Sequence, residues 1–156
     1  CQDNEISWID WSLLEKNKDL FEFFKFMIDY RKKHPVIRKK LDNAVCGMEA
    51  MHAHDVNAER MEVPQNAKTL AVSFAGYDRK KGKDDLVYVA VNAYWEEVKI
   101  TLPNLANHGA WYLSVDTYGD EKGKYFYQEG EEIRIDREYV MKPRSIVVFT
   151  GREILR

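Results

Sequence analysis

After Pro64 the apolar residues of the chain follow a period of two, and this feature constrains the fold more than any other. Such alternation indicates β-strands, because successive side chains of a strand point to opposite faces of its sheet. The expected strands are 69–75, 86–93, 98–102, 111–116, 133–135, 139–141 and 145–149. Short strands at this spacing, with no helix among them, predict a mainly β protein built as an antiparallel β-sandwich.

Two details of this region refine the prediction. The segment 86–93 is almost continuously apolar, so we expect it to lie centrally with both faces covered. The charged stretch from Asp78 to Asp85 connects it to the strand before, and we expect this stretch to be a solvated hairpin tip.

One long helix is predicted before the strands, from Lys18 to Lys33, and Pro35 ends it. Its apolar residues recur at three- and four-residue spacing and are Leu20, Phe21, Phe23, Phe24, Met27, Ile28 and Tyr30. This apolar arc is wide for a helix on an independent surface, and the sequence holds no second helix of similar quality. We therefore expect Phe21, Phe24 or Met27 to pack on the sandwich or on another copy of the chain.

The start of this helix carries two capping signals. Asn17 is a suitable N-cap residue for it. The Ser-x-x-Glu spacing of Ser12 and Glu15 indicates a single helical turn just before it, following Trp11.

Periodicity is lost between Val36 and about Gln65, which predicts a long connection over the surface between the helix and the strands. His52, His54 and Asp55 lie in this segment. Two histidines two positions apart, without a third ligand, are weak evidence for a metal site. We expect these side chains to pack in the loop, and we predict no metal site and no cofactor for the chain.

The charge balance and the cysteine count exclude several partners. The chain carries 24 basic and 26 acidic residues, a net charge of −2, and both signs are interspersed, so no basic stripe indicates nucleic acid. No apolar run approaches the roughly 18 residues that a membrane-spanning helix requires. Two cysteines, Cys1 and Cys46, cannot form a disulfide framework, which favours a reducing compartment.

Candidate chemistry is concentrated in residues 1–11, which show neither helical nor strand periodicity. The chain begins inside this stretch without an initiator Met, so we expect it to be part of a larger protein. The residues that suit contacts with a sugar are Asp3, Asn4, Glu5, Trp8 and Trp11. Carboxylates and amides bond hydroxyl groups, and indole rings stack on sugar rings. The alternative is that both tryptophans pack the helix against a missing partner.

The acids of this stretch are poor candidates for catalysis by the chain alone. Glycoside hydrolysis requires two carboxylates that are fixed roughly 5 to 10 Å apart across the sugar. A terminal segment cannot hold Asp3, Glu5 or Asp10 in that geometry without support. We therefore assign no catalytic residue.

Aromatic residues make up 13% of the chain, which indicates either a large core or a platform for flat ligands. Trp95 and Trp111 each lie next to a tyrosine and are candidates for a surface contact with sugar. Packing in the core or at its rim is the alternative for both residues.

The first eleven residues, CQDNEISWIDW, resemble the CQDNE…W…DW segment of bacterial glycogen debranching enzymes and pullulanases of the isoamylase type. These enzymes belong to the α-amylase superfamily, glycoside hydrolase family thirteen. The resemblance continues at 30–38, where YRKKHPVIR is close to the family's RK-x-HPV. It runs on through 84–96, 102–103, 111–112, 115–117 and 143–148, and so covers essentially the whole chain.

The resemblance implies a division of the chain into three parts. Residues 1–40 would be the end of a TIM-type catalytic barrel, with its last loop and last helix. Residues 41–66 would be a connection, and residues 67–156 the C-terminal β-sandwich. The long helix would then be left over from the barrel, which would explain its wide apolar arc.

The larger enzyme implied by the resemblance hydrolyses α-1,6 branch linkages in glycogen, starch or pullulan with retention, using a carboxylate nucleophile and a Glu acid/base. In the family those groups lie upstream of the position of Cys1, so the chain alone would support the barrel and would not be catalytic. Its implied partners are the barrel of the same polypeptide and, through it, an α-glucan. The implied location is the cytoplasm.

Two features limit what is carried over from the family. The family's His-Asp pair precedes the loop that residues 1–11 resemble, whereas His54-Asp55 follows it, so the two do not correspond. The region around Cys46 matches the family only in part. Two other functions stay open at this point: an independent carbohydrate-binding module, and a structural domain that forms oligomers.

Overall fold

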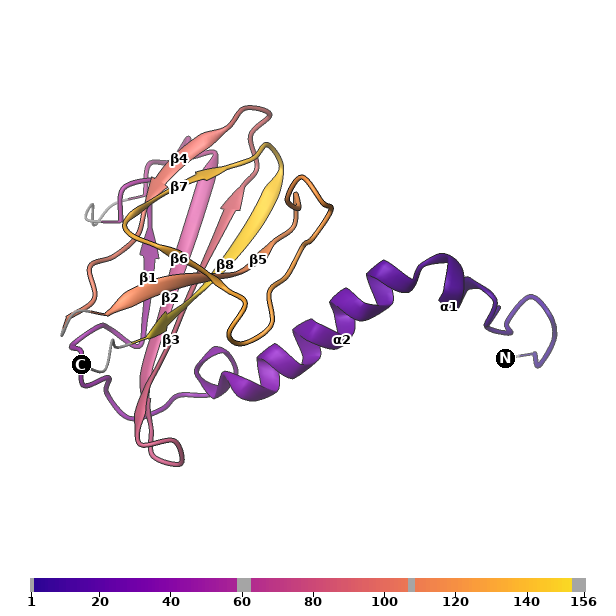
Figure 1. The fold of residues 1–156 in the computed structure, drawn as a ribbon, viewed down its shortest axis with the longest axis horizontal. Coiled ribbons are helices and arrows are strands. Elements are labelled where there is room, and N and C mark those ends of the chain that lie inside the picture. Colours follow the sequence, from indigo (N-terminus) through magenta and orange to yellow (C-terminus); the bar gives the residue numbers. More distant parts are fainter. Residues whose placement is uncertain (1, 59–62, 107–108, 153–156) are drawn as a thin grey trace.

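The larger of two sheets has its strands in the order β1-β2-β3-β8-β5-β6, and the smaller sheet pairs β4 with β7 (Figure 1). A computed structural model describes residues 2–58, 63–106 and 109–152. The strands are β1 (Met51–His54), β2 (Thr69–Asp78), β3 (Lys83–Asn92), β4 (Val98–Thr101), β5 (Ala110–Asp116), β6 (Ile133–Ile135), β7 (Glu138–Met141) and β8 (Ser145–Arg152). All neighbouring strands in these sheets are antiparallel. The expected mainly β, antiparallel fold is confirmed.

Strand β3 lies between β2 and β8 and has both faces buried, as its apolar run predicts. Leu86, Tyr88 and Ala90 belong to the core on one face of the sheet. Val87 and Val89 belong to the core on the other face. The strand therefore serves two separate cores, which is why its sequence shows no polar alternation.

The first core lies between the larger sheet and the β4–β7 sheet. Ile100 and Met141 on the smaller sheet pack into the same cluster as Tyr88, Trp111 and Phe149 on the larger one. The sandwich therefore has unequal layers within the described residues, with six strands facing two.

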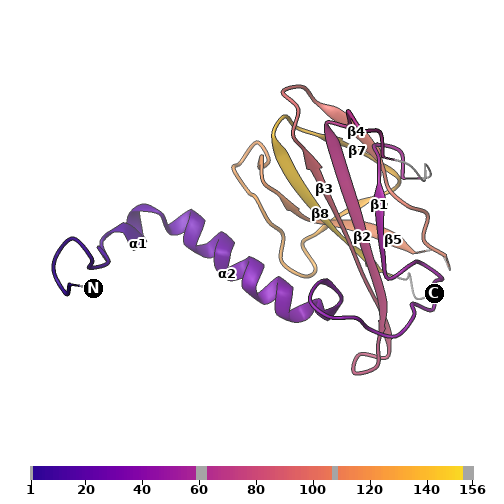
Figure 2. The ribbon, with the colours of Figure 1, turned by 180° about the vertical axis from the view of Figure 1, so that it is seen from behind.

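The second core lies between the other face of the larger sheet and the helical segment. This segment comprises α1 (Leu13–Lys16), α2 (Lys18–Lys33) and the 3-10 helix η1 (Pro35–Ile37). Tyr30 and Val36 pack with Val87, Val115 and Val148. Both views show α2 projecting from the sheets, so that α1 and the N-terminal residues lie far from the strands (Figures 1 and 2).

The apolar arc of α2 divides into two stripes. The inner stripe, defined by Phe23, Phe26, Met27 and Tyr30, packs toward the sandwich. The outer stripe, defined by Leu20, Phe21, Phe24 and Ile28, is exposed. The expectation that this helix packs on the sandwich is right for Met27. Phe21 and Phe24 do not pack on the sandwich and remain 48% and 59% exposed, because the sheet reaches only one side of the helix. Their packing on another copy of the chain stays a prediction.

The helix begins and ends at the expected residues, but its start is not capped as expected. The Asn17 side chain donates to the Leu13 carbonyl oxygen at 3.1 Å and makes no cap hydrogen bond. The Ser12 hydroxyl donates to Asp10 instead of capping α1. The single helical turn predicted after Trp11 is nevertheless present as α1. Asn17 does not cap α2 because α1 runs directly into α2, so that Asn17 sits at a joint between the two helices.

The segment 41–66 is not irregular throughout, contrary to the prediction. Its residues 51–54 form strand β1, which pairs with β2 at the edge of the larger sheet. The strand was missed because MHAH is only four residues long and its burial runs against its pattern, with Met51 and Ala53 exposed and His54 buried. His54 is buried there, its Nε2 lies 2.8 Å from the Ser73 hydroxyl, and its Nδ1 lies 3.1 Å from the Ala58 carbonyl oxygen.

The stretch from Asp78 to Asp85 is the hairpin tip between β2 and β3, and its residues 79–83 are exposed as predicted. Asp78 and Asp85 at its two ends are buried, contrary to the prediction. The Asp85 carboxylate accepts the Val36 backbone N–H at 3.1 Å and lies 2.6 Å from Nδ1 of His34. The carboxylate of its neighbour, Asp84, accepts the backbone N–H groups of residues 45 and 46, both at 2.8 Å. Two adjacent acids at the start of β3 therefore hold the chain that leaves α2.

We expect Asp85→Asn to lower the free energy of unfolding by about 1–3 kcal/mol, because one buried hydrogen-bond partner of the carboxylate loses its acceptor. Urea denaturation measures this change. The matched control is Asp136→Asn, whose side chain is 95% exposed and should change the free energy by less than about 0.5 kcal/mol. Equal effects of the two substitutions would contradict the role of Asp85.

His54 predicts a dependence of stability on pH. Burial lowers the pKa of its imidazole below the ordinary 6.5. As the pH falls through about 6.5 the unfolded chain binds a proton that the folded chain does not, so stability decreases toward acid. Urea denaturation at about pH 7.5 and about pH 5.5 should show a smaller loss for His54→Gln than for the native chain. Identical losses would rule out His54 as the source.

Candidate functional site

The residues predicted to contact sugar lie together at the far end of α2 from the strands (Figure 1). Cys1 lies outside the described residues. The loop from Gln2 to Trp11 folds on itself around Asn4, whose carbonyl oxygen accepts the N–H groups of Ser7 and Trp8 at 2.9 and 3.2 Å. The Asn4 side chain accepts the Ile6 N–H at 3.1 Å. The turn therefore needs no support from the sandwich.

This turn brings two of the predicted residues into contact. The indole N–H of Trp8 donates to the Asp3 carboxylate at 2.5 Å. Trp8 and Trp11 are 63% and 74% exposed, and Glu5 is exposed as well. The loop thus presents carboxylate, amide and indole groups to solvent, which are the groups that bind sugar hydroxyls and ring faces.

Asp10, the third acid of the loop, has a local structural role. Its carboxylate accepts the hydroxyl of Ser12 at 2.6 Å and the Ser12 backbone N–H at 2.9 Å. These two hydrogen bonds lower the pKa of Asp10. Both hydrogen bonds hold the start of α1, so the Asp10 carboxylate stabilises the local structure of this segment.

The exposed apolar surface continues from this loop along the helices. Large exposed apolar residues of this region are Ile6, Trp8, Ile9, Trp11, Leu13, Leu14, Leu20, Phe21, Phe24 and Ile28. Contiguous apolar surface of this kind marks sites of association. The outer stripe of α2 and the N-terminal loop therefore form one candidate interface.

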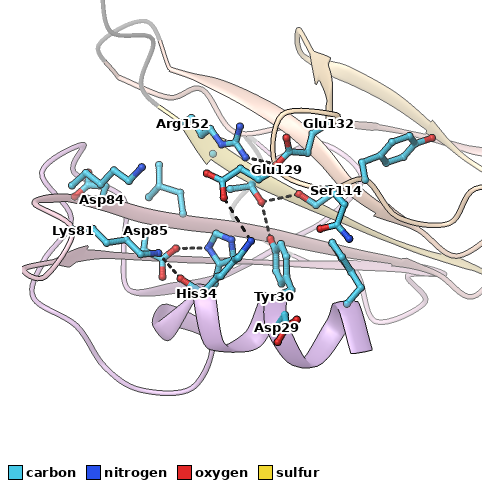
Figure 3. A pocket seen from close by; sticks show the side chains of 18 of the residues that line it. Asp29, Tyr30, His34, Lys81, Asp84, Asp85, Ser114, Glu129, Glu132 and Arg152 are labelled. Atoms are coloured by element: carbon cyan, nitrogen blue, oxygen red, sulfur yellow. Dashed lines mark hydrogen bonds and ion pairs between the residues drawn. The ribbon is translucent and has the colours of Figure 1, made fainter. Parts of the chain in front are cut away.

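A pocket of about 880 Å³ lies between α2, the larger sheet and the loop before β6 (Figure 3). The hydroxyl of Tyr30 lies 2.8 Å from that of Thr150, which lies 2.8 Å from that of Ser114. Burial raises the pKa of Tyr30. On the opposite wall Arg152 forms an ion pair with Glu132. These polar groups bind one another across the pocket walls, so the pocket lies at the joint between the helix and the sandwich.

Trp111 is not a surface contact, contrary to the prediction. It is 2% exposed, it packs in the core, and its indole N–H donates to the Pro103 carbonyl oxygen at 2.7 Å. Trp95 is exposed and pairs with Tyr94 on the β3–β4 connection. Lys68, which precedes β2, reaches the rings of Tyr94 and Trp95 from another segment, and no sequence pattern indicated this contact.

In the ranges 2–58, 63–106 and 109–152 no three His, Cys, Asp or Glu side chains are grouped so that they could hold a metal ion. None of the helices described is both long enough and apolar enough to cross a membrane.

Comparison with known proteins gives relatives of one kind. A glycogen operon protein GlgX homolog of Mycobacterium tuberculosis is 50% identical over 40 residues, which are 26% of this chain and 6% of the relative. The GlgX homolog of Mycobacterium bovis matches equally. The chloroplastic isoamylase 3 of Oryza sativa subsp. japonica is 28% identical over 116 residues, 74% of this chain and 13% of the relative. The chain thus spans only a small part of the length of these relatives.

The sequence model of a family described as "Isoamylase, C-terminal" matches residues 45–150. This range includes β1 to β7 and all of β8 except its last two residues. It covers well over half of the chain, and the resemblance seen in the sequence motifs points the same way. The chain belongs to the isoamylase C-terminal family.

Proposed function

We propose that this chain is the C-terminal part of a cytoplasmic enzyme that hydrolyses α-1,6 branch linkages of glycogen or a related α-glucan. In this proposal residues 1–40 complete the catalytic barrel and residues 67–156 form the β-sandwich that supports it. Residues 41–66 form the connection between these two parts. The observation that carries the proposal is the outer stripe of α2, which is apolar, exposed and held in place by the sandwich. Family membership and the word glycogen in the name of the mycobacterial relatives support the substrate class.

The inner side of α2 is fixed well enough to present the outer stripe to a partner. Phe26 stacks on Phe126 with ring centroids 4.6 Å apart, and Tyr30 bonds to Thr150. The Asp85 carboxylate holds the residues that follow the helix. A helix that packs on one domain with one side and exposes apolar residues on the other is suited to lie between two domains.

The barrel of the same polypeptide is the partner that fits this surface. Complete burial of a Leu, Ile or Phe side chain contributes about 1.5–3 kcal/mol. The four residues of the outer stripe are already about half covered, so each would contribute roughly 1 kcal/mol on docking. If α2 is the last helix of the barrel, the N-terminal loop that precedes α2 lies at the rim of the barrel.

In that position the loop would contact the substrate. Asp3, Asn4 and Glu5 would bond sugar hydroxyls, and Trp8 and Trp11 would stack on sugar rings. The proposal assigns no catalytic group to these residues, since hydrolysis would use carboxylates on the earlier barrel strands.

The chain alone should release no reducing ends from pullulan, because the proposed catalytic carboxylates are not part of it. The full-length enzyme that contains this chain should release them under the same conditions. A reducing-sugar assay on both proteins is the measurement. Release by the 156-residue chain would show that the catalytic groups are within it.

Phe24→Ser should separate the role of the outer stripe from that of the inner stripe. In the full-length enzyme it should lower the melting temperature, because a docked phenyl group is lost. In the isolated chain, where Phe24 is exposed, the change should be small. Differential scanning calorimetry on both proteins measures the two effects.

The matched control is Phe26→Ser on the inner stripe, which should lower the melting temperature of both proteins, since Phe26 packs on Phe126 in the chain itself. If Phe24→Ser left the full-length enzyme unchanged, the barrel would not cover the outer stripe. Light scattering of the full-length enzyme tests the other occupant, a second copy. A dimer that Phe24→Ser dissociates would also contradict barrel docking.

A further inference from the structure

The connection between β3 and β4 carries a group of side chains that the proposed role of the chain does not use. Trp95 is 64% exposed. Its ring centroid lies 4.3 Å from that of Tyr94, with the ring planes 39° apart. Lys68 Nζ lies 3.7 Å from the Tyr94 centroid and 5.5 Å from the Trp95 centroid. We propose that Trp95, Tyr94 and Lys68, here called the aromatic platform, bind an α-glucan chain at a site separate from the active site.

The platform stands on a turn that is fixed from below. Asn92 is buried, and its side-chain amide donates to the carbonyl oxygens of Glu96 and Lys142 at 2.9 and 3.0 Å. Its amide oxygen accepts the Tyr94 N–H at 3.0 Å. One buried side chain thus joins both ends of the turn to the neighbouring β7–β8 turn. A binding surface that is already ordered loses little entropy when the ligand binds.

The neighbouring turn holds the platform through a residue in an unfavourable conformation. Arg144 has φ of 51°, and its backbone N–H donates to the Tyr94 carbonyl oxygen at 3.0 Å. A non-glycine residue in this region costs of order 1–3 kcal/mol and persists only where the surrounding structure imposes it. Such residues concentrate at sites of function, and this one supports the backbone of the platform directly.

The ring of Trp95 is the open part of the platform. Lys68 Nζ lies closer to the Tyr94 ring than to the Trp95 ring, so the lysine contacts mainly the tyrosine. Tyr94 in turn supports Trp95 from one side. This leaves an indole of fixed orientation in solvent, and the part of its ring that Tyr94 and Lys68 do not contact is available for stacking.

The surroundings fit a sugar better than a protein partner. The exposed charged residues Lys68, Glu96, Glu97 and Arg144 surround or adjoin the turn. They offer hydrogen-bond donors and acceptors of the kind that hydroxyl groups use. A single indole among charges provides too little apolar surface for a stable protein interface, which buries roughly 800 Å² per partner. A sugar ring has one apolar face of about the size of the indole, with hydroxyls around its edge.

The platform lies at the opposite end of β3 from the helix joint. Asp85 holds the joint, and the platform turn follows Asn92, seven residues along the strand. At about 3.3 Å per residue this separates the two by roughly 23 Å. A glucan bound at the platform would therefore leave the N-terminal loop free for the branch that is being cleaved.

The choice of α-glucan rests on the proposed function, whereas the platform itself rests on its geometry. Electrophoresis of the 156-residue chain in gels that contain glycogen or amylose tests both. We expect retarded migration, and we expect Trp95→Ala to weaken the apparent affinity at least about tenfold, which corresponds to 1.4 kcal/mol. Trp95→Phe keeps a ring that can stack and should retain part of the retardation.

The control is Met51→Ala, an exposed side chain on β1, which should migrate as the native chain does. Circular dichroism confirms that each variant is folded. Unretarded migration of the native chain, or equal retardation of the native chain and Trp95→Ala, would overturn the proposal. Retardation by hydroxyethylcellulose and not by glycogen would overturn the assignment to α-glucan. Failure of the full-length enzyme to hydrolyse pullulan is a different result, since it removes the proposed function and leaves the gel measurement intact.

Discussion

The hydrogen bonds of Asp84 and Asp85 on β3 are the constraint on which the arrangement of this chain depends. β3 is held in the sheet by β2 and β8, so its position is set by the sandwich. The two carboxylates transfer that position to the segment after α2, because they bind its backbone N–H groups at 2.8–3.1 Å. A charged acceptor makes such hydrogen bonds stronger than neutral ones. The direction in which α2 leaves the sandwich follows from them.

Because the direction of α2 is fixed, its inner stripe faces the sandwich and its outer stripe faces away from it. The inner stripe closes the second core of the sheet, with Phe26 on Phe126 and Tyr30 on Thr150. The outer stripe has no partner among the described residues that covers it, and the N-terminal loop before the helices also exposes its two tryptophans. A helix of a barrel that is shared with a neighbouring domain requires such a division of its surface. The wide apolar arc read from the sequence is thus two narrower contact surfaces side by side.

The sequence predicted the elements of this fold better than their contacts. The helix 18–33 and the expected strands are present because each has its own period of apolar residues. The burial of Asp85 and Trp111 depends on residues far away in the chain, and no local pattern reports such contacts. β1 was missed for a related reason, since the pairing of so short an edge strand is decided by its neighbour β2. The sugar-contacting roles of the N-terminal loop and of Trp95 stay predictions.

The helix joint and the aromatic platform lie at opposite ends of β3, and this strand holds them at a fixed separation. A surface site increases the effective concentration of substrate at an active site only if the distance between the two sites is restricted. Here the platform follows one end of β3 and the helix joint binds the other, so a single paired strand defines their separation. A flexible link in place of the Asp84 and Asp85 contacts would let the sandwich turn about the helix, and the bound glucan would lose its register with the active site. In the proposed enzyme, the acids of the joint would therefore influence how a glucan bound at the platform is placed relative to the active site, although they lie roughly 23 Å from the platform.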